Sequence, residues 1–309
     1  MTPKEIWTLV KNSFSAWSGD YAPSMGAALS YYTLFSIAPL LIIVIAVAGL
    51  FFGADAVRGV IFEQLHALMG EESAEAVQDM LASASEPTTG AIATVVSIGG
   101  LLIGATTAFG EMQNDLDRIW RAPAADKTSG IWKLLRTRLL SFGMILGVAF
   151  LLTVSLVTSA ALSAIGKWWD GYLGGWETLA HVLDIVVNLG LLTVIFALIY
   201  KLIPRVKVAW HDVWIGAAFT AVLFTIGKVL IGLYLGKSDV ASTFGTAGSV
   251  VLMMIWVYYA SQIFLLGAEF TRVYAETHGS RRSAAEKERR RTERRSPSHR
   301  PHLTSASPA

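Results

Sequence analysis

The chain of 309 residues contains no cysteine, and only 16% of its residues are charged. The lack of cysteine excludes a disulfide framework, a thiolate nucleophile and any zinc or iron–sulfur site with cysteine ligands. Soluble domains carry roughly 25% charged residues. The low charge, together with 53% apolar residues and a mean hydropathy of +0.51, therefore indicates a membrane protein.

Sequence signatures of nucleotide-binding and metal-dependent enzymes are also missing. None of the six histidines forms an HExxH motif or an i,i+4 pair, and neither a Walker A motif nor a dinucleotide fingerprint occurs. Glu111, Asp115 and Asp117 form a dense acidic group. Beside Arg118 and Arg121, however, such a group is more typical of a solvated charged face than of a metal site. We therefore expect no enzymatic activity, no cofactor and no metal ion.

Six segments are apolar and long enough to cross a membrane as helices, which takes about 20 residues. The predicted spans cover about residues 30–52, 90–110, 139–163, 180–202, 213–235 and 246–269. Asp184 and Lys228 are the only charges well inside these windows. The alternative is a soluble protein, which would need six separate buried helices that are each this long and this nearly free of charge. We therefore predict an all-α polytopic membrane protein with a membrane domain over residues 23–271.

The distribution of Lys and Arg predicts the orientation of the chain, because basic residues resist translocation. The N-terminal segment, the connections after the second and fourth spans and the C-terminal region together hold 21 of the 25 Lys and Arg residues. The opposite side holds Arg58, Lys167 and Lys237. Both termini are therefore predicted to be cytoplasmic.

Two segments outside the spans carry helical patterns. Ile6, Val10, Phe14 and Trp17 lie on one face of a helix, which predicts that residues 1–22 form an amphipathic helix lying in the cytoplasmic interface. The loop over residues 53–86 contains seven acidic residues and one Arg, and its apolar residues recur at helical spacing. This pattern predicts an extracytoplasmic subdomain of two short amphipathic helices.

Residues 272–309 form a basic segment with few large apolar side chains. Such a segment buries too little surface to offset its chain entropy, so we expect a disordered cytoplasmic tail. On a membrane-anchored chain, anionic lipid headgroups are nearer partners than nucleic acid, and no specific nucleic acid is expected.

Polar groups at membrane depth are costly, so each one is a functional candidate. The cytoplasmic ends of the second and sixth spans carry polar stripes at helical spacing, which predict an inner vestibule together with two tyrosines of the first span. Its predicted lining comprises Tyr31, Tyr32, Glu111, Asn114, Gln262 and Glu269. The alternative is an interfacial salt-bridge network that holds helix ends together, with Arg118 and Arg272 as partners of the acids.

Three further features of the spans have both a functional and a structural interpretation. Pro39 removes a helical hydrogen bond and predicts a hinge in the first span, or a kink that only improves packing. Asp184 and Lys228 lie about 6 Å and about 10 Å below the outer boundary, which permits an ion pair; alternatively, Lys228 snorkels and Asp184 sits at the interface. Gly100 and Gly104 allow close helix packing, including that of homo-oligomers.

Three segments resemble one family of bacterial membrane proteins. AALSYYTLFSIAPL at residues 27–40 closely resembles the first-helix signature of the YihY/BrkB family, and NDLDRIW at 114–120 resembles the stretch after its second helix. FGTAG at 244–248, followed by IWVY at 255–258 and LGAE at 266–269, is similar to its last helix. The resemblance covers roughly residues 5–275.

This resemblance implies a six-helix protein of the bacterial inner membrane with both ends in the cytoplasm. The resemblance defines no reaction. Some members carry the label ribonuclease BN, but no nuclease motif occurs in this sequence. A role in moving envelope lipids, suggested for relatives, favours a non-ATP-driven transporter or flippase for a lipid or an amphipathic envelope component. The alternative is a non-transporting envelope scaffold or interaction protein, and a membrane nuclease comes third.

Overall fold

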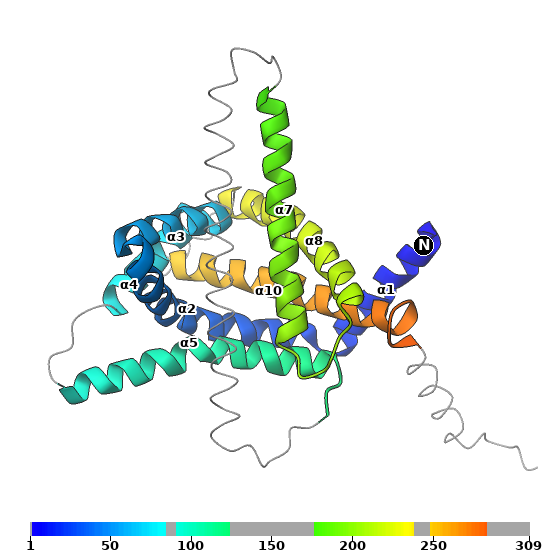
Figure 1. Ribbon diagram of the computed structural model, residues 1–309, viewed down its shortest axis with the longest axis horizontal. Helices are drawn as coiled ribbons and strands as arrows, with labels where there is room; N and C mark the ends of the chain where they lie inside the picture. Colours follow the sequence, from blue (N-terminus) through cyan, green and yellow to red (C-terminus); the bar gives the residue numbers. More distant parts are fainter. Residues whose placement is uncertain (1, 85–90, 124–175, 238–247, 283–309) are drawn as a thin grey trace, which may run out of the picture.

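The computed structural model describes residues 2–84, 91–123, 176–237 and 248–282, and every regular element in these ranges is an α-helix (Figure 1). In chain order the helices are α1 (Pro3–Gly19), α2 (Ala22–Phe52), α3 (Ala54–Met69), α4 (Glu71–Ala84), α5 (Ala91–Ile119), α7 (Trp176–Leu202), α8 (Trp210–Lys237) and α10 (Gly248–Thr277).

Four of these helices are long and apolar enough to cross a membrane. Their candidate spans are Ala22–Leu50, Ile185–Leu202, Trp210–Tyr234 and Gly248–Thr277, which correspond to the predicted first, fourth, fifth and sixth spans. α5 covers the predicted second span, and the predicted third span at 139–163 lies outside the described residues. The structure thus shows an all-helical protein with several candidate membrane spans, while the count of six stays a prediction.

α10 is the helix around which the others are arranged. It contacts α1, α2, α4, α5 and α8, and its second half is buried at almost every position between Ser261 and Ala275. In Figure 1, α2, α5 and α10 run side by side, whereas α7 stands at a steep angle to them and packs on α8. The ends of α2, α5 and α10 that carry the predicted vestibule residues therefore meet at one end of the bundle.

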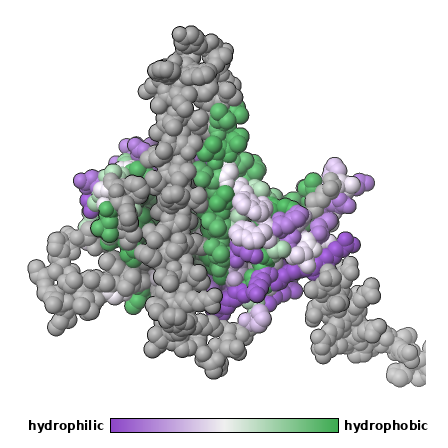
Figure 2. All heavy atoms as spheres, in the orientation of Figure 1, coloured by the Kyte–Doolittle hydropathy of each residue, from purple (hydrophilic) through white to green (hydrophobic). Residues whose placement is uncertain are grey.

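Apolar side chains pack at both ends of this arrangement. The larger cluster joins α2, α5, α7, α8 and α10 at the predicted cytoplasmic end, with Leu116, Tyr200 and Leu265 among its buried members. A smaller cluster at the opposite end joins Met253 of α10 to Leu34 of α2 and Val77 of α4. Figure 2 shows hydrophobic residues along α7, with hydrophilic residues gathered below and to the right of it.

The N-terminal helix begins at a capping box, in which Thr2 and Glu5 exchange side-chain-to-backbone hydrogen bonds. Leu9 packs against α10, whereas Ile6 and Phe14 are exposed. Periodicity locates the apolar residues of this helix but does not say which of them meet protein. The exposed pair remains available to the membrane interface.

α2 stays helical through Pro39, and this part of the helix packs closely on α5. A Cβ atom on Gly104 would lie 3.0 Å from Cγ of Pro39, so glycine permits this approach. The hydroxyl of Ser36 donates a hydrogen bond to the Gly104 carbonyl (2.6 Å) and accepts one from the Ala108 amide (3.3 Å). The single hydroxyl proton of Ser36 is therefore directed to α5 and not to the carbonyl that Pro39 leaves without a donor in its own helix.

The C-terminal boundary of the membrane domain also differs from the prediction. α10 continues to Thr277, and the amide of Ser280 donates a hydrogen bond to the buried Asp212 carboxylate (3.1 Å). The segment from Arg272 to residue 282 is thus ordered against α8. The rest of the predicted tail lies outside the described residues.

We predict that Gly104→Leu lowers the stability of the protein, because a larger side chain must displace Pro39 or separate α2 from α5. Overpacking of this kind costs about 1–3 kcal/mol. Thermal unfolding in detergent measures the effect. Gly100→Leu is the matched control, because a Cβ atom at Gly100 meets nothing within 4 Å. Equal melting temperatures for the two variants would contradict the close α2–α5 contact.

Candidate functional site

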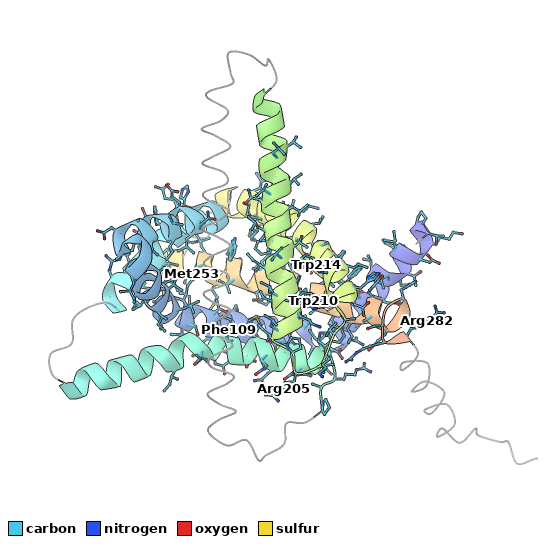
Figure 3. The ribbon with its side chains drawn as sticks, in the orientation of Figure 1. Phe109, Arg205, Trp210, Trp214, Met253 and Arg282 are labelled. Atoms are coloured by element: carbon cyan, nitrogen blue, oxygen red, sulfur yellow. The ribbon has the colours of Figure 1, made fainter. Side chains whose placement is uncertain are left out.

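The predicted cytoplasmic end of α5 is attached to the connection between α7 and α8. Asp117 accepts a hydrogen bond from the amide of Arg205 (2.7 Å), and its other carboxylate oxygen lies 3.2 Å from the Arg205 guanidinium. Gln113 donates a hydrogen bond to the carbonyl of Ile203 in the same connection (3.0 Å). Figure 3 shows Arg205 at this junction. These contacts combine an ion pair with hydrogen bonds to two backbone groups of the connection. Together they fix where the end of α5 lies relative to the connection between α7 and α8.

Asp115 lies beside this junction but is not part of it. Its carboxyl group is almost fully buried, and within the described part of the chain Oδ2 has no hydrogen-bond partner. Burial, together with the nearby Glu111 carboxylate, raises the pKa of Asp115 to about 7, while Arg118 opposes the shift. Asp115 therefore changes its charge near neutral pH, which an ordinary surface aspartate does not.

Arg272 is the centre of a charged cluster where α1, α2 and α10 meet. Its Nε and Nη2 atoms both donate hydrogen bonds to Oε2 of Glu269, at 3.0 and 2.7 Å, and its Nη1 atom donates to Glu276 (3.1 Å). Asp20, at the turn between α1 and α2, lies 3.8 Å from Nη2. Glu269 is fully buried, whereas Asp20 and Glu276 reach the surface.

Gln262 lies two turns before Glu269 on α10 and closes a gap over α2. Its amide nitrogen donates a weak hydrogen bond to the carbonyl of Pro23 (3.4 Å), and its side chain occupies the space that a Cβ atom on Gly26 would need. The Gln262 side-chain oxygen is buried and has no partner among the described residues. The contact between Gln262 and α2 therefore includes a hydrogen-bond acceptor that no described residue uses.

The other predicted vestibule residues lie around the interface of α2 and α5. Ser36 faces Gly104 and Ala108 across these antiparallel helices, so Tyr32 and Glu111, each about one turn further toward the predicted cytoplasmic end, lie at a similar level. Both are partly buried, whereas Asn114 is exposed. Tyr31 is 53% exposed, and its ring packs against that of Phe35 on the surface of α2.

The six predicted vestibule residues thus occupy one end of three neighbouring helices without all facing one space. Gln262 and Glu269 point into the bundle, Tyr32 and Glu111 lie along the α2–α5 interface, and Tyr31 is on the surface. A groove of about 220 Å³ lies elsewhere, between α1 and the end of α10, with Lys4, Thr8, Asn12 and His278 in its lining. Among the described residues no group of acids and histidines could hold a metal ion.

The predicted outer ion pair is not settled by the structure. Lys228 is exposed on α8, and the side chain of Asp184 is outside the described set. In Figure 1 the first half of α7 and the second half of α8 point in different directions. The pair of Asp184 and Lys228 stays a prediction.

Several polar contacts at the predicted cytoplasmic end were not foreseen from the sequence. The hydroxyl of Tyr200 donates a hydrogen bond to the Phe264 carbonyl (2.7 Å) and lies 3.2 Å from the hydroxyl of Thr220. Asp117 with Arg205 forms another such contact. The proximity of these residues depends on helix packing. Two signals in the sequence could have suggested the pair of Asp117 and Arg205. One is an acidic residue after an apolar helix, and the other is a basic residue in a short loop.

We predict that Asp115→Asn makes the protein more stable than the wild type above pH 7, with a difference that shrinks toward acidic pH. The folded-state pKa of Asp115 lies above the ordinary aspartate value of 3.8. Its contribution to stability is therefore complete below the unfolded value and is lost as the pH rises through about 7. Asparagine, which stays neutral, does not suffer this loss.

Melting temperatures across a pH series test this prediction, with Asp79→Asn as the control because Asp79 is exposed on α4. A difference between Asp115→Asn and wild type that does not change with pH would show that the carboxyl group keeps one charge state over the series.

Comparison with known proteins agrees with the resemblance seen in the sequence. The family model "Virulence factor BrkB" matches residues 13–292. The UPF0761 membrane protein of Pseudomonas aeruginosa is 28% identical over 255 residues, which cover 81% of this chain and 58% of that protein. Those of Azotobacter vinelandii and Tolumonas auensis are each 29% identical and cover 83% of this chain, with 60% and 82% of the relatives covered.

The chain thus spans less than two thirds of the Pseudomonas and Azotobacter relatives. No solved structure matches it. Because the family model covers most of the sequence, the chain belongs to the virulence factor BrkB family of membrane proteins.

Proposed function

We propose that this protein moves a lipid or another amphipathic envelope component across the bacterial inner membrane without ATP. In this proposal it has six spans, both termini lie in the cytoplasm, and it is neither an enzyme nor a cofactor-binding protein. The observation that carries the proposal is a line of polar contacts along α2, from its cytoplasmic end toward its middle.

This line has three levels. At the start of α2, Asp20 lies by the buried pair of Arg272 and Glu269. One turn further, Gln262 contacts the Pro23 carbonyl while its side-chain oxygen stays unpaired. Two turns beyond this, Tyr32 lies at the level of Glu111. Because polar groups are costly inside a membrane, a series of them beside one helix supports a path for a polar headgroup.

The surface beside this line suits the apolar part of such a substrate. Tyr31 and Phe35 are exposed next to each other on α2, and Leu50 is exposed further along the same helix. A lipid could keep its acyl chains against this surface while its headgroup follows the polar contacts. An amphipathic substrate therefore fits the arrangement better than a wholly polar solute.

Two predicted elements complete the proposal. Pro39 would act as the hinge, because the helix can bend where the proline removes a hydrogen bond and where its ring faces Gly104 of α5, which has no side chain. Asp184 and Lys228 would form the outer gate, an ion pair that opens when α7 moves against α8. Each of these elements changes the width of the path rather than its chemistry.

A non-transporting scaffold is the second candidate, and one observation favours it. Asp117 with Arg205, and Asp212 with Ser280, pair within the protein and join helix ends. In this role the outer helices or the basic tail would bind other proteins or anionic lipid headgroups, and glycine faces would support homo-oligomers. Loss of copurifying partners after deletion of residues 55–85 or 280–309 would favour the scaffold.

We predict that the wild-type protein accelerates movement of headgroup-labelled phospholipid across proteoliposomes and that Glu111→Gln/Glu269→Gln abolishes this acceleration. The two substitutions remove charge at the first and third levels of the polar line. Glu75→Gln/Asp79→Asn is the matched control, because it also neutralises two carboxylates but on the exposed side of α4. Empty vesicles give the background rate.

Three results are informative in this experiment. Movement that is lost in the first double variant and kept in the control supports lipid transport along α2. Equal movement in both variants would show that the polar line is not the path. If folded, inserted wild type moves no lipid, the proposed function is wrong for phospholipids.

A further inference from the structure

The charged cluster around Arg272 contains more negative than positive charge. The carboxylates of Glu269, Glu276 and Asp20 share one guanidinium, which lies 2.7, 3.1 and 3.8 Å from them. No other cation contacts Glu269 among the residues that the structure describes. With all groups ionised, two negative charges would remain without a partner in a largely buried place.

This excess is hardest to tolerate at Glu269. Its side chain has no exposure to solvent, whereas 29% of Asp20 and 34% of Glu276 remain exposed. Both hydrogen bonds from Arg272 to Glu269 end on Oε2. Oε1 is buried and has no hydrogen-bond donor within the described part of the chain. A buried acceptor without a donor costs about 1–3 kcal/mol, and more for a charged group.

Asp20 provides the second half of the site. It follows α1 directly, interacts with the Glu269 carboxylate as well as with Arg272, and is partly open to solvent. Two carboxylates that face each other repel when both are ionised, and one proton shared between them removes the repulsion. The nearby Glu276 contacts the opposite side of the guanidinium, through Nη1.

We propose that Glu269 and Asp20 form a proton-binding site, in which a proton on Oε1 of Glu269 is donated as a hydrogen bond to the Asp20 carboxylate. Asp20 is the route by which the proton enters from the cytoplasmic side. Uptake of one proton gives the unpaired oxygen a hydrogen bond, reduces the excess charge by one unit and leaves the bonds from Arg272 to Oε2 in place.

The site has a direct consequence for the structure around it. With the proton bound, Asp20 is held to α10 through Glu269, and the turn between α1 and α2 is fixed. Without it, the two carboxylates repel and this turn is released from α10. Resting on the proposed function, this inference identifies the proton as the ion that couples to movement of the substrate past α2.

Infrared spectroscopy of the reconstituted full-length protein tests the site without measuring transport. All proteins in this experiment carry Asp115→Asn, because the buried Asp115 also takes up a proton near neutral pH. In this background we expect the carbonyl stretch of a protonated, buried carboxylic acid that is lost as the buffer is made alkaline. Glu269→Gln should lack this band. Glu276→Gln should keep it, because Glu276 binds the same guanidinium but is partly exposed. Asp20→Asn should shift the band, because it changes the hydrogen-bond acceptor.

The inference is overturned if the Asp115→Asn protein lacks the band at every pH, or if the band persists when Glu269→Gln is added to it in a folded protein. Should Glu269→Gln fail to insert, an unshifted band in Asp20→Asn overturns the proposal instead. The two proposals also fail separately. A protonated Glu269 in a protein that moves no lipid ends the proposed function only, and lipid movement by a protein whose Glu269 is always ionised ends the proton site only.

Discussion

The buried ion pair of Arg272 with Glu269 sets the conditions for the end of the bundle where α1, α2 and α10 meet. A guanidinium inside a helix bundle is stable only when carboxylates and hydrogen bonds surround it, and loss of one partner of a buried pair costs about 3–5 kcal/mol. The turn between α1 and α2 must therefore bring Asp20 to α10. The same turn places α1 along α10, where Leu9 packs.

Close packing on the other side of α10 depends on small residues. A Cβ atom on Gly267 would collide with Thr220 and with the Tyr200 hydroxyl, so glycine lets three helices meet at one point. The hydroxyl of Tyr200 uses this space to donate to a carbonyl of α10. Gly267 leaves the space in which the Tyr200 hydroxyl makes its hydrogen bond to α10. This contact holds α7 and α8 to the half of α10 that also carries the ion pair of Arg272 with Glu269.

The sequence predicted the parts of this fold that depend on one helix at a time. Long apolar stretches with at most one charge well inside them located α2, α7, α8 and α10, because the length of a membrane helix is set by the bilayer. Polar spacing likewise drew attention to Gln262 and Glu269 before their positions were known. A family signature such as NDLDRIW was recognised as well, but its physical role became clear only when Asp117 was found against Arg205.

What the sequence left open depends on how helices pair. Arg272 was placed at the start of a basic tail and also, as the alternative to a vestibule, among the partners of the acids. In the structure it pairs with acids on both sides of it along α10. Apolar residues at helical spacing on an interfacial helix such as α1 can face lipid or protein, and only the neighbouring helix decides which.

The number of charges in the cluster around Arg272 bears on the two interpretations of the polar residues, an inner vestibule and a salt-bridge network that joins helix ends. A network that serves only to join helix ends is most stable when each charge has a partner, as Asp117 and Arg205 do. The cluster around Arg272 departs from this rule, because three carboxylates share one guanidinium and a buried oxygen has no donor. Such an arrangement costs stability that an apolar contact would not. The proposed proton site accounts for this cost, because one bound proton would supply the missing hydrogen bond and reduce the excess negative charge.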